Sequence, residues 1–153
     1  MNGWSIRLAT KEDAEFVYDH RWDRGEPELA RYGVDRQKWI DACLKMVSEG
    51  NCFTIDRMGM PEAVLGLEGD SGVYHTWFQA TSTESLPGLT RYLRRAINSL
   101  AKIVKAKKAI ITALCAHPDA PGWYGFLGFK EDASFTCYAS GPQPRRFVRT
   151  WDV

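Results

Sequence analysis

Three side chains in this sequence could accept a proton from a substrate. His75 and Glu68 lie on or next to a predicted central strand, and His117 follows a later predicted strand. An imidazole or a carboxylate can serve as a general base, so His75 and Glu68 are candidate catalytic bases. Structural roles remain open for all three: His75 packed beside aromatic residues, Glu68 exposed in a hairpin turn, and His117 capping a short helix.

A second candidate site is electrostatic. Residues 85–118 contain no acidic side chain and these basic ones: Arg91, Arg94, Arg95, Lys102, Lys105, Lys107 and Lys108. They could meet a phosphate group or a nucleic-acid backbone, or they could form the solvated face of an amphipathic helix. Arg145, Arg146 and Arg149 could bind an acidic protein partner. The formal net charge of +1 gives no global attraction to nucleic acid or membrane, so nucleic-acid binding is the least favoured hypothesis.

The elements that must position these residues begin with a strand. Trp4 to Leu8 alternates apolar and polar residues, which predicts a half-buried strand. Thr10 and Asp35 are typical amino-terminal caps of two helices, and Gly50 is a typical helix end. Three further strands are predicted at Cys52–Arg57, Ala63–Leu67 and Val73–Ala80, with turns at 58–61 and 68–72.

The second half of the chain opens with the longest predicted helix, Leu86 to about Lys105, which has apolar residues at spacings of three and four. A buried strand follows at Ala109–Leu114, and then a short aromatic helix. Two last strands are predicted around Phe135 and Cys137 and around Phe147 and Val148. This order predicts one mixed α/β domain over residues 1–153, with a twisted mixed sheet of about seven strands flanked by helices.

The stretch from His117 to Phe129 resembles a known signature. It matches the pattern Asn-Pro-x-Ala-x-x-x-Tyr-x-x-x-Gly-Phe of the GNAT N-acetyltransferase superfamily, with His117 in place of the asparagine. The predicted order of elements is also the GNAT order, so the resemblance spans nearly the whole chain. It implies a GNAT-like acyl-CoA N-acyltransferase domain that transfers acetyl from acetyl-CoA to a free amine.

The resemblance also implies roles for individual residues. Tyr124 occupies the position of the general acid that protonates the departing CoA thiolate, although an aromatic residue there could instead belong to the core. The strand end would bind the pantetheine arm, and the start of the long helix would bind the pyrophosphate. The residues expected to contact the cofactor are Trp77, Phe78, Gln79, Ala80, Thr81, Ser85, Gly88, Thr90 and His117.

Only one residue, Gly88, fits the superfamily loop pattern Arg/Gln-x-x-Gly-x-Gly/Ala, because Ser85 and Thr90 depart from it. Lost acetyl-CoA binding is therefore the alternative. The run Thr76–Ser82 is similar to GNAT-like proteins of short-tailed bacteriophages, some of which are internal virion proteins. That similarity implies a catalytically degenerate phage protein, acting as a virion component or on a host protein partner.

Composition limits the remaining classes. Hydrophobic residues at 44% and charged residues at 25% are ordinary for a soluble globular protein. Cys43, Cys52, Cys115 and Cys137 have no Cys-x-x-Cys spacing, which predicts reduced core thiols and no metal site.

No stretch approaches the ~20 apolar residues of a membrane helix, and no signal peptide is recognisable. We expect a protein of the cytoplasm, or of the host cytoplasm or virion if phage-encoded. The sequence leaves the acceptor, the base and the oligomeric state open.

Overall fold

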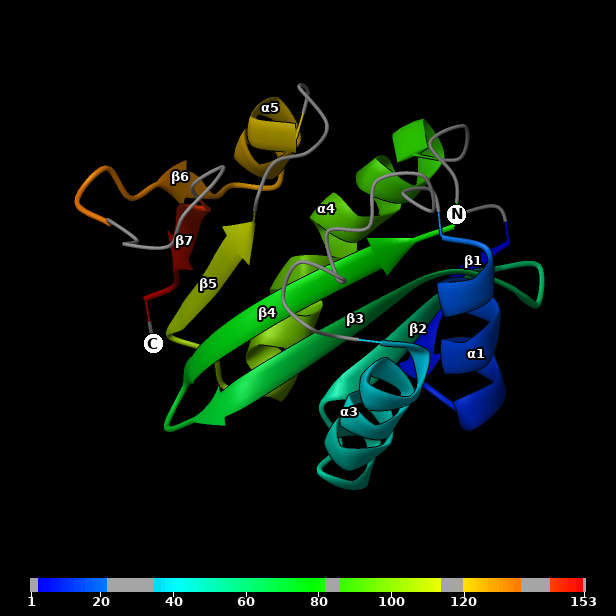
Figure 1. Ribbon diagram of the computed structural model, residues 1–153. Coiled ribbons are helices and arrows are strands. Elements are labelled where there is room, and N and C mark those ends of the chain that lie inside the picture. The colour runs from blue at the N-terminus through cyan, green and yellow to red at the C-terminus, as the bar shows by residue number, and fades with distance from the viewer. Residues whose placement is uncertain (1–2, 22–34, 82–85, 114–119, 136–143, 153) are drawn as a thin grey trace. The chain divides into compact units, whose positions relative to one another are not determined.

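The computed structural model describes residues 3–21, 35–81, 86–113, 120–135 and 144–152 (Figure 1). The elements along the chain are β1 (Trp4–Leu8), α1 (Lys11–Asp19), α3 (Arg36–Ser48), β2 (Cys52–Arg57), β3 (Met60–Asp70), β4 (Val73–Ala80), α4 (Leu86–Ile103), β5 (Lys108–Ala113), α5 (Ala120–Phe126), β6 (Lys130–Glu131) and β7 (Arg145–Thr150). This order of strands and helices is the predicted one.

The strands form a seven-stranded mixed sheet in the order β1-β2-β3-β4-β5-β7-β6. The pairs β1/β2, β2/β3, β5/β7 and β6/β7 are antiparallel, whereas β4 and β5 are parallel. A parallel pair needs a crossover connection, and α4 provides it between β4 and β5. The predicted mixed α/β class and the seven strands are confirmed.

The chain forms two compact units. Unit 1 comprises Met1–Glu68 and Trp77–Tyr92, and unit 2 comprises Gly69–Thr76 and Leu93–Val153. Both β4 and α4 contribute residues to each unit. The single domain over residues 1–153 stays a prediction.

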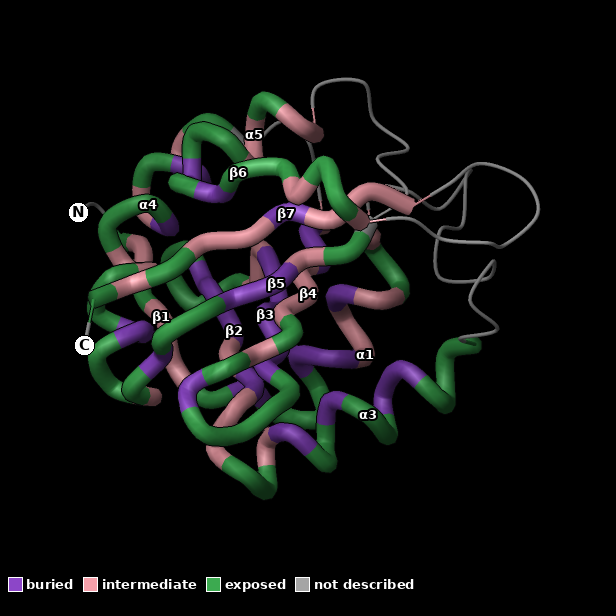
Figure 2. Tube along the Cα trace, turned by 90° about the vertical axis from the view of Figure 1, so that its left-hand side faces the viewer, coloured by how far each residue is buried: buried purple, intermediate pink, exposed green. Residues whose placement is uncertain are grey.

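The core of unit 1 lies between the sheet and two helices. Helices α1 and α3 lie side by side on one face of the strands (Figure 1), and Figure 2 shows buried positions along both helices and along β2 and β3. The ring of Trp77 packs edge-on against Trp39 with centroids 5.6 Å apart. It also lies directly over Gly66, where even a Cβ atom would overlap the indole. Cys43 and Cys52 are buried free thiols, as predicted.

The predicted helix ends are confirmed in atomic detail. Thr10 and Asp13 form a reciprocal capping box at the start of α1. The Asp35 carboxylate accepts a hydrogen bond of 2.9 Å from the Lys38 backbone N–H at the start of α3. Gly50 has φ +76° after α3, and Asn51 N–H donates to the Met46 carbonyl at 2.8 Å, as in a Schellman motif.

The central hairpins differ from the prediction, because their turns are shorter. Met58 and Gly59 form one turn and Ser71 and Gly72 the other, and all four residues have positive φ. Two-residue turns of this kind match the twist of the flanking strands, so the strands absorb the residues that the sequence placed in loops. β3 therefore runs from Met60 to Asp70, and Glu68 lies in a strand instead of a turn.

The sixth strand also differs from the prediction. It lies at Lys130–Glu131, where Lys130 pairs with Val148 and Glu131 with Phe147. The Asp132 carboxylate accepts a hydrogen bond of 3.0 Å from Ser134 N–H, and this local turn ends the strand before Phe135. Cys137 lies outside the described residues, as do Cys115 and Leu114.

Candidate functional site

The predicted cofactor strand is the carboxyl-terminal half of β4. The register of β4 with the parallel strand β5 pairs Val73–His75 with Lys108–Ile110. Trp77–Ala80 lie beyond this paired segment, in the part of β4 that belongs to unit 1. Trp77 and Phe78 are half-buried, whereas Gln79 and Ala80 are buried.

At the end of β4, Thr81 is tied to Glu62 on β3. The Thr81 backbone N–H donates to the Glu62 carbonyl at 3.0 Å, and the Thr81 hydroxyl lies 3.4 Å from the Glu62 carboxylate oxygen Oε2. Glu62 lies between the predicted turn at 58–61 and the predicted strand Ala63–Leu67, so the sequence pattern does not single it out. Counting outward from the two-residue turn at Ser71 and Gly72 would have placed residues 62 and 81 opposite each other.

The amino terminus of α4 retains features that suit an anion. Pro87 is exposed, Gly88 is half-buried, and the first turn of the helix contains no acidic residue. Backbone N–H groups at a helix start attract negative charge, and a glycine there leaves the backbone open to approach. Behind Gly88 lies Trp4, whose ring stacks on Tyr92 with centroids 6.1 Å apart. Burial, and then the charge of Asp56, raise the pKa of Tyr92.

Of the two residues that depart from the loop pattern, Thr90 is described by the structure and Ser85 is not. Thr90 is only 8% exposed, so its side chain is enclosed within the protein instead of projecting from the helix start. Ser85 lies outside the described residues, as does His117. The binding of a pyrophosphate at Gly88 therefore stays a prediction, and Thr90 is a buried residue of the helix.

Tyr124 lies on α5 in unit 2 and is half-buried. Its ring packs on Phe147 with centroids 4.7 Å apart. Phe129 N–H donates to the Tyr124 carbonyl at 3.0 Å, and Gly128, at φ +91°, donates to the Gly125 carbonyl at 2.9 Å. This Schellman motif explains the spacing Tyr-x-x-x-Gly-Phe, because the turn at Gly128 brings Phe129 back to the helix.

The two predicted bases lie on different elements. His75 is exposed on β4 in unit 2, and Glu68 is exposed on β3 in unit 1. Glu68 lies three residues before the turn at Ser71, whereas Thr81 and Glu62 lie at the other end of the same hairpin. Within unit 1, Glu62 is thus the carboxylate in contact with the end of the predicted cofactor strand.

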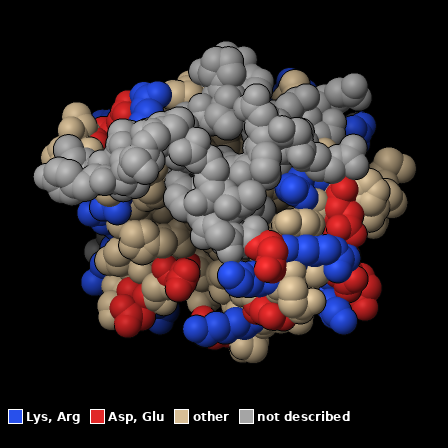
Figure 3. Space-filling view, viewed as in Figure 1, with Lys and Arg blue, Asp and Glu red and all other residues tan. Residues whose placement is uncertain are grey.

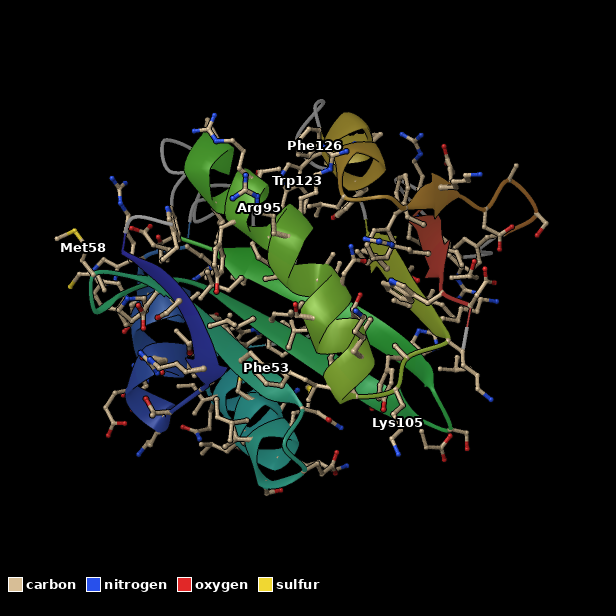
Figure 4. All side chains as sticks on the ribbon, turned by 180° about the vertical axis from the view of Figure 1, so that it is seen from behind. Phe53, Met58, Arg95, Lys105, Trp123 and Phe126 are labelled. Carbon is tan, nitrogen blue, oxygen red and sulfur yellow. The ribbon has the colours of Figure 1, made fainter. Side chains whose placement is uncertain are left out.

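The arginines of α4 and those of β7 in unit 2 make different contacts. Arg94 lies over the Phe126 ring at 4.6 Å from its centroid, and both side chains are exposed; Figure 4 shows Phe126, Trp123 and the neighbouring Arg95. Arg145 is ion-paired with Glu131. The Arg149 guanidinium donates to the Leu127 carbonyl and to Asn98. Arg145 and Arg149 are therefore engaged within unit 2, and the Arg146 guanidinium lies over the Phe135 ring at 4.1 Å from its centroid.

Charges of both signs are interspersed on the face shown in Figure 3. In the described part of the chain, no group of three or more His, Cys, Asp and Glu residues could hold a metal ion. None of the described helices is both long enough and apolar enough to cross a membrane.

Sequence reasoning also missed a buried ionic network in unit 1. The Arg7 guanidinium pairs with Asp13 on α1 and with Asp56 on β2. Thr54 donates to Asp13 at 2.9 Å, and Ser5 donates to Asp56 at 2.8 Å. Both carboxylates are almost fully buried. The network joins β1, β2 and α1, and its two carboxylates and Thr54 are buried in unit 1.

Neither the models of protein families nor the sequences of curated proteins gave a match to this chain. Solved structures do match. One is yncA from Salmonella typhimurium with its cofactor acetyl-CoA, at 14% identity and a TM-score of 0.67, covering 99% of this chain and 95% of that one. Another is an N-acetyltransferase from Staphylococcus aureus Mu50, at 11% identity and a TM-score of 0.72, covering 96% of this chain and 98% of that one.

A third is a chimera of the spermidine N-acetyltransferase SpeG from Vibrio cholerae and hSSAT, at 14% identity and a TM-score of 0.73, covering 97% of this chain and 96% of that one. The similarity extends over nearly the full length of all these chains. The strand order is that of the GNAT fold. The chain therefore has the GNAT fold that its sequence pattern predicted.

Proposed function

We propose that this chain is an acetyl-CoA-dependent N-acetyltransferase that acts on a free amine. The observation that carries the proposal is the fixed register of Tyr124 with Gly128 and Phe129, in a chain with the GNAT fold. The position of Gly88 at the start of α4 and the absence of acidic residues in the first turn of this helix support a bound pyrophosphate. Trp77 to Thr81 follow the paired part of β4 and would hold the pantetheine arm.

Acetyl-CoA supplies the activated thioester. The Tyr124 hydroxyl donates its proton to the sulfur while the carbon–sulfur bond breaks and the amine nitrogen bonds to the carbonyl carbon. A base accepts the proton that the nitrogen loses, so the products are the acetamide and the CoA thiol. The phenolate then regains a proton from solvent. A phenol of ordinary pKa about 10 is a suitable donor to a thiolate.

We propose Glu62 as the base, alongside the sequence candidates Glu68 and His75. Glu62 is half-buried and contacts Thr81 at the end of the proposed cofactor strand, whereas Glu68 and His75 are exposed nearer the other end of the hairpin. A carboxylate at this position would also attract a cationic amine. Asp23, Glu26 and Glu28 would also favour a cationic amine by their charge, but they lie outside the described residues.

The test is a calorimetric titration of the full chain with acetyl-CoA, followed by an amine screen. The screen begins with spermidine, the substrate named for one structural neighbour. Micromolar binding with amine-dependent release of CoA thiol supports the enzyme. Absence of heat up to ~1 mM cofactor, equivalent to only about 4 kcal/mol of binding, overturns it. That outcome favours the alternative, a catalytically degenerate bacteriophage protein that acts as a virion component or through a protein partner. The sequence features behind this alternative are the run Thr76–Ser82 and the departures from the loop pattern at Ser85 and Thr90.

A further inference from the structure

Strand β1 is an end strand of the sheet, and one of its sides has no strand partner among the described residues (Figures 1 and 4). Its pairing with β2 shows which backbone groups are used. Ala9 N–H donates to the Cys52 carbonyl at 3.0 Å, and Met58 N–H donates to the Gly3 carbonyl at 2.7 Å. Backbone groups alternate in direction along an antiparallel strand. The backbone N–H and C=O groups of Ser5 and Arg7 therefore also point towards β2. The same groups of Trp4, Ile6 and Leu8 point away from the sheet.

The outward-facing residues also share one face of the sheet, because side chains alternate along a strand. Trp4 and Ile6 are half-buried and Leu8 is 51% exposed. Phe53 lies opposite Leu8 on β2 and is half-buried; Figure 4 shows it on the sheet face behind the plane of Figure 1. An apolar row thus reaches the edge of the sheet.

Protection of the edge strand β1 is limited to one charged residue. Natural edge strands commonly carry a free lysine, a proline or a bulge, which discourage pairing with another chain. The one charged residue of β1 is Arg7, and its guanidinium is held on the other face by Asp13 and Asp56. Its Nη1 lies 3.4 Å from the Leu8 carbonyl, a long contact that leaves this acceptor open to a shorter bond.

We propose that two copies of this chain associate through antiparallel pairing of their β1 strands, with Ile6 on the two-fold axis. In this register Ile6 faces Ile6 of the second copy, and Trp4 faces Leu8. All three outward residues of each copy then form hydrogen-bonded pairs, and the sheets continue across the axis. We choose a second copy as the partner of this edge because β1 is self-complementary. Ile6 lies at its centre, and Trp4 and Leu8 lie two residues before and after it.

The polar face is compatible with the same register. Ser5 lies opposite Arg7 of the second copy, so no like charges face each other directly. A register moved by one residue would set the outward groups of one strand against residues whose groups already bond to β2. The pairing therefore excludes a shift by one residue, and a shift by two would leave fewer of Trp4, Ile6 and Leu8 paired. It is independent of the catalytic proposal, because none of its residues belongs to the proposed site.

The experiment measures the molar mass of the full chain by sedimentation velocity over a wide concentration range. We expect the mass to rise towards twice that of the monomer as the concentration increases. Leu8→Lys places a charge in the apolar row at an exposed position, and it should abolish the rise. Leu44→Lys, the same change at an exposed leucine of α3, should leave the rise intact. Circular dichroism confirms that each variant is folded.

A cross-link tests the register itself. Ile6→Cys places two thiols opposite each other at a hydrogen-bonded pair, where Cα atoms lie about 5.5 Å apart, within the range of a disulfide. Mild oxidation should give a covalent dimer, whereas Ser5→Cys and the wild-type chain should not. A wild-type chain that remains monomeric throughout overturns the proposal. So does a dimer that persists in Leu8→Lys, or one that Ser5→Cys links as readily as Ile6→Cys.

Discussion

At the residue scale, the position of Tyr124 depends on the turn that follows it. The hydrogen bond from Phe129 N–H to the Tyr124 carbonyl needs positive φ at Gly128, which a glycine adopts at low cost. The ring is packed on Phe147, so the orientation of the phenol is set by the core of unit 2 and not by solvent. A group held in this way is suited to deliver a proton.

The first prediction concerns the phenol. Tyr124→Phe removes the hydroxyl but keeps the ring contact with Phe147, so the fold and the affinity for acetyl-CoA should be unchanged. We expect kcat to fall by about a hundred- to ten-thousand-fold, the usual contribution of a general acid. Steady-state kinetics and calorimetry on the same preparation separate the two effects. Full activity in Tyr124→Phe would assign the residue to the core alone.

The second prediction distinguishes the candidate bases. Glu62→Gln keeps the size of the side chain and removes its charge, and we expect kcat to fall by at least about a hundredfold with its pH profile altered. Glu68→Gln makes the same change on the same strand at an exposed position and should leave kcat unchanged. If Glu68→Gln or His75→Gln loses activity and Glu62→Gln does not, the sequence candidates were right and Glu62 is not the base.

At the element scale, α4 connects the proposed cofactor strand to its crossover partner and presents its amino terminus at Gly88. Its first turn contains no acidic residue that would compensate the positive end of the helix dipole. Its apolar stripe is confirmed by the burial of Leu89, Leu93 and Leu100. The helix is thus fixed by its inner face, and changes at its exposed first turn should act on ligand binding and not on folding.

The third prediction concerns the exposed first turn of α4. Pro87→Glu adds a carboxylate at an exposed position of the first turn, where it is favourable for the helix but repels a pyrophosphate. Pro87→Gln is the neutral control of the same size. We expect calorimetry to show acetyl-CoA binding about tenfold weaker for Pro87→Glu than for Pro87→Gln, with similar melting temperatures. Equal affinities would place the pyrophosphate elsewhere.

At the scale of the whole molecule, stability should depend on pH through the ionic network of unit 1. Burial by itself raises the pKa of Asp13, but hydrogen bonds from Arg7, Thr10 and Thr54 together outweigh it, so the pKa of Asp13 lies below its ordinary value. The unfolded chain therefore takes up this proton at a higher pH than the folded one. The stabilisation is complete above the ordinary pKa of about 4 and is lost as the pH falls through the lower folded value.

The fourth prediction follows from this sign. Urea unfolding midpoints of the wild-type chain should fall between about pH 5 and pH 3, as expected for a carboxylate with a depressed folded pKa. Asp13→Asn cannot take up the proton, so it should start less stable and lose less stability over the same range. Parallel curves for the two chains would mean that Asp13 does not carry the acid sensitivity.

The sequence by itself determined the kinds of element and their order, because these follow from local rules, although it misplaced the sixth strand and the ends of β3. Apolar periodicity placed α4 and β5, and the side chains of Thr10 and Asp35 and the glycine at position 50 placed the helix ends that the structure confirms. The order of elements and the Tyr-x-x-x-Gly-Phe spacing were enough for the fold, since that spacing records a local helix-end motif.

Only the tertiary structure decided which residues meet across the sheet. The hairpin turns are two residues long, which moved Glu68 into a strand and brought Glu62 against Thr81. Thr90 is enclosed, and Arg7 is bound to two buried carboxylates that lie far apart in the sequence. Strand register and burial arise from contacts between distant residues, and a local pattern does not contain them.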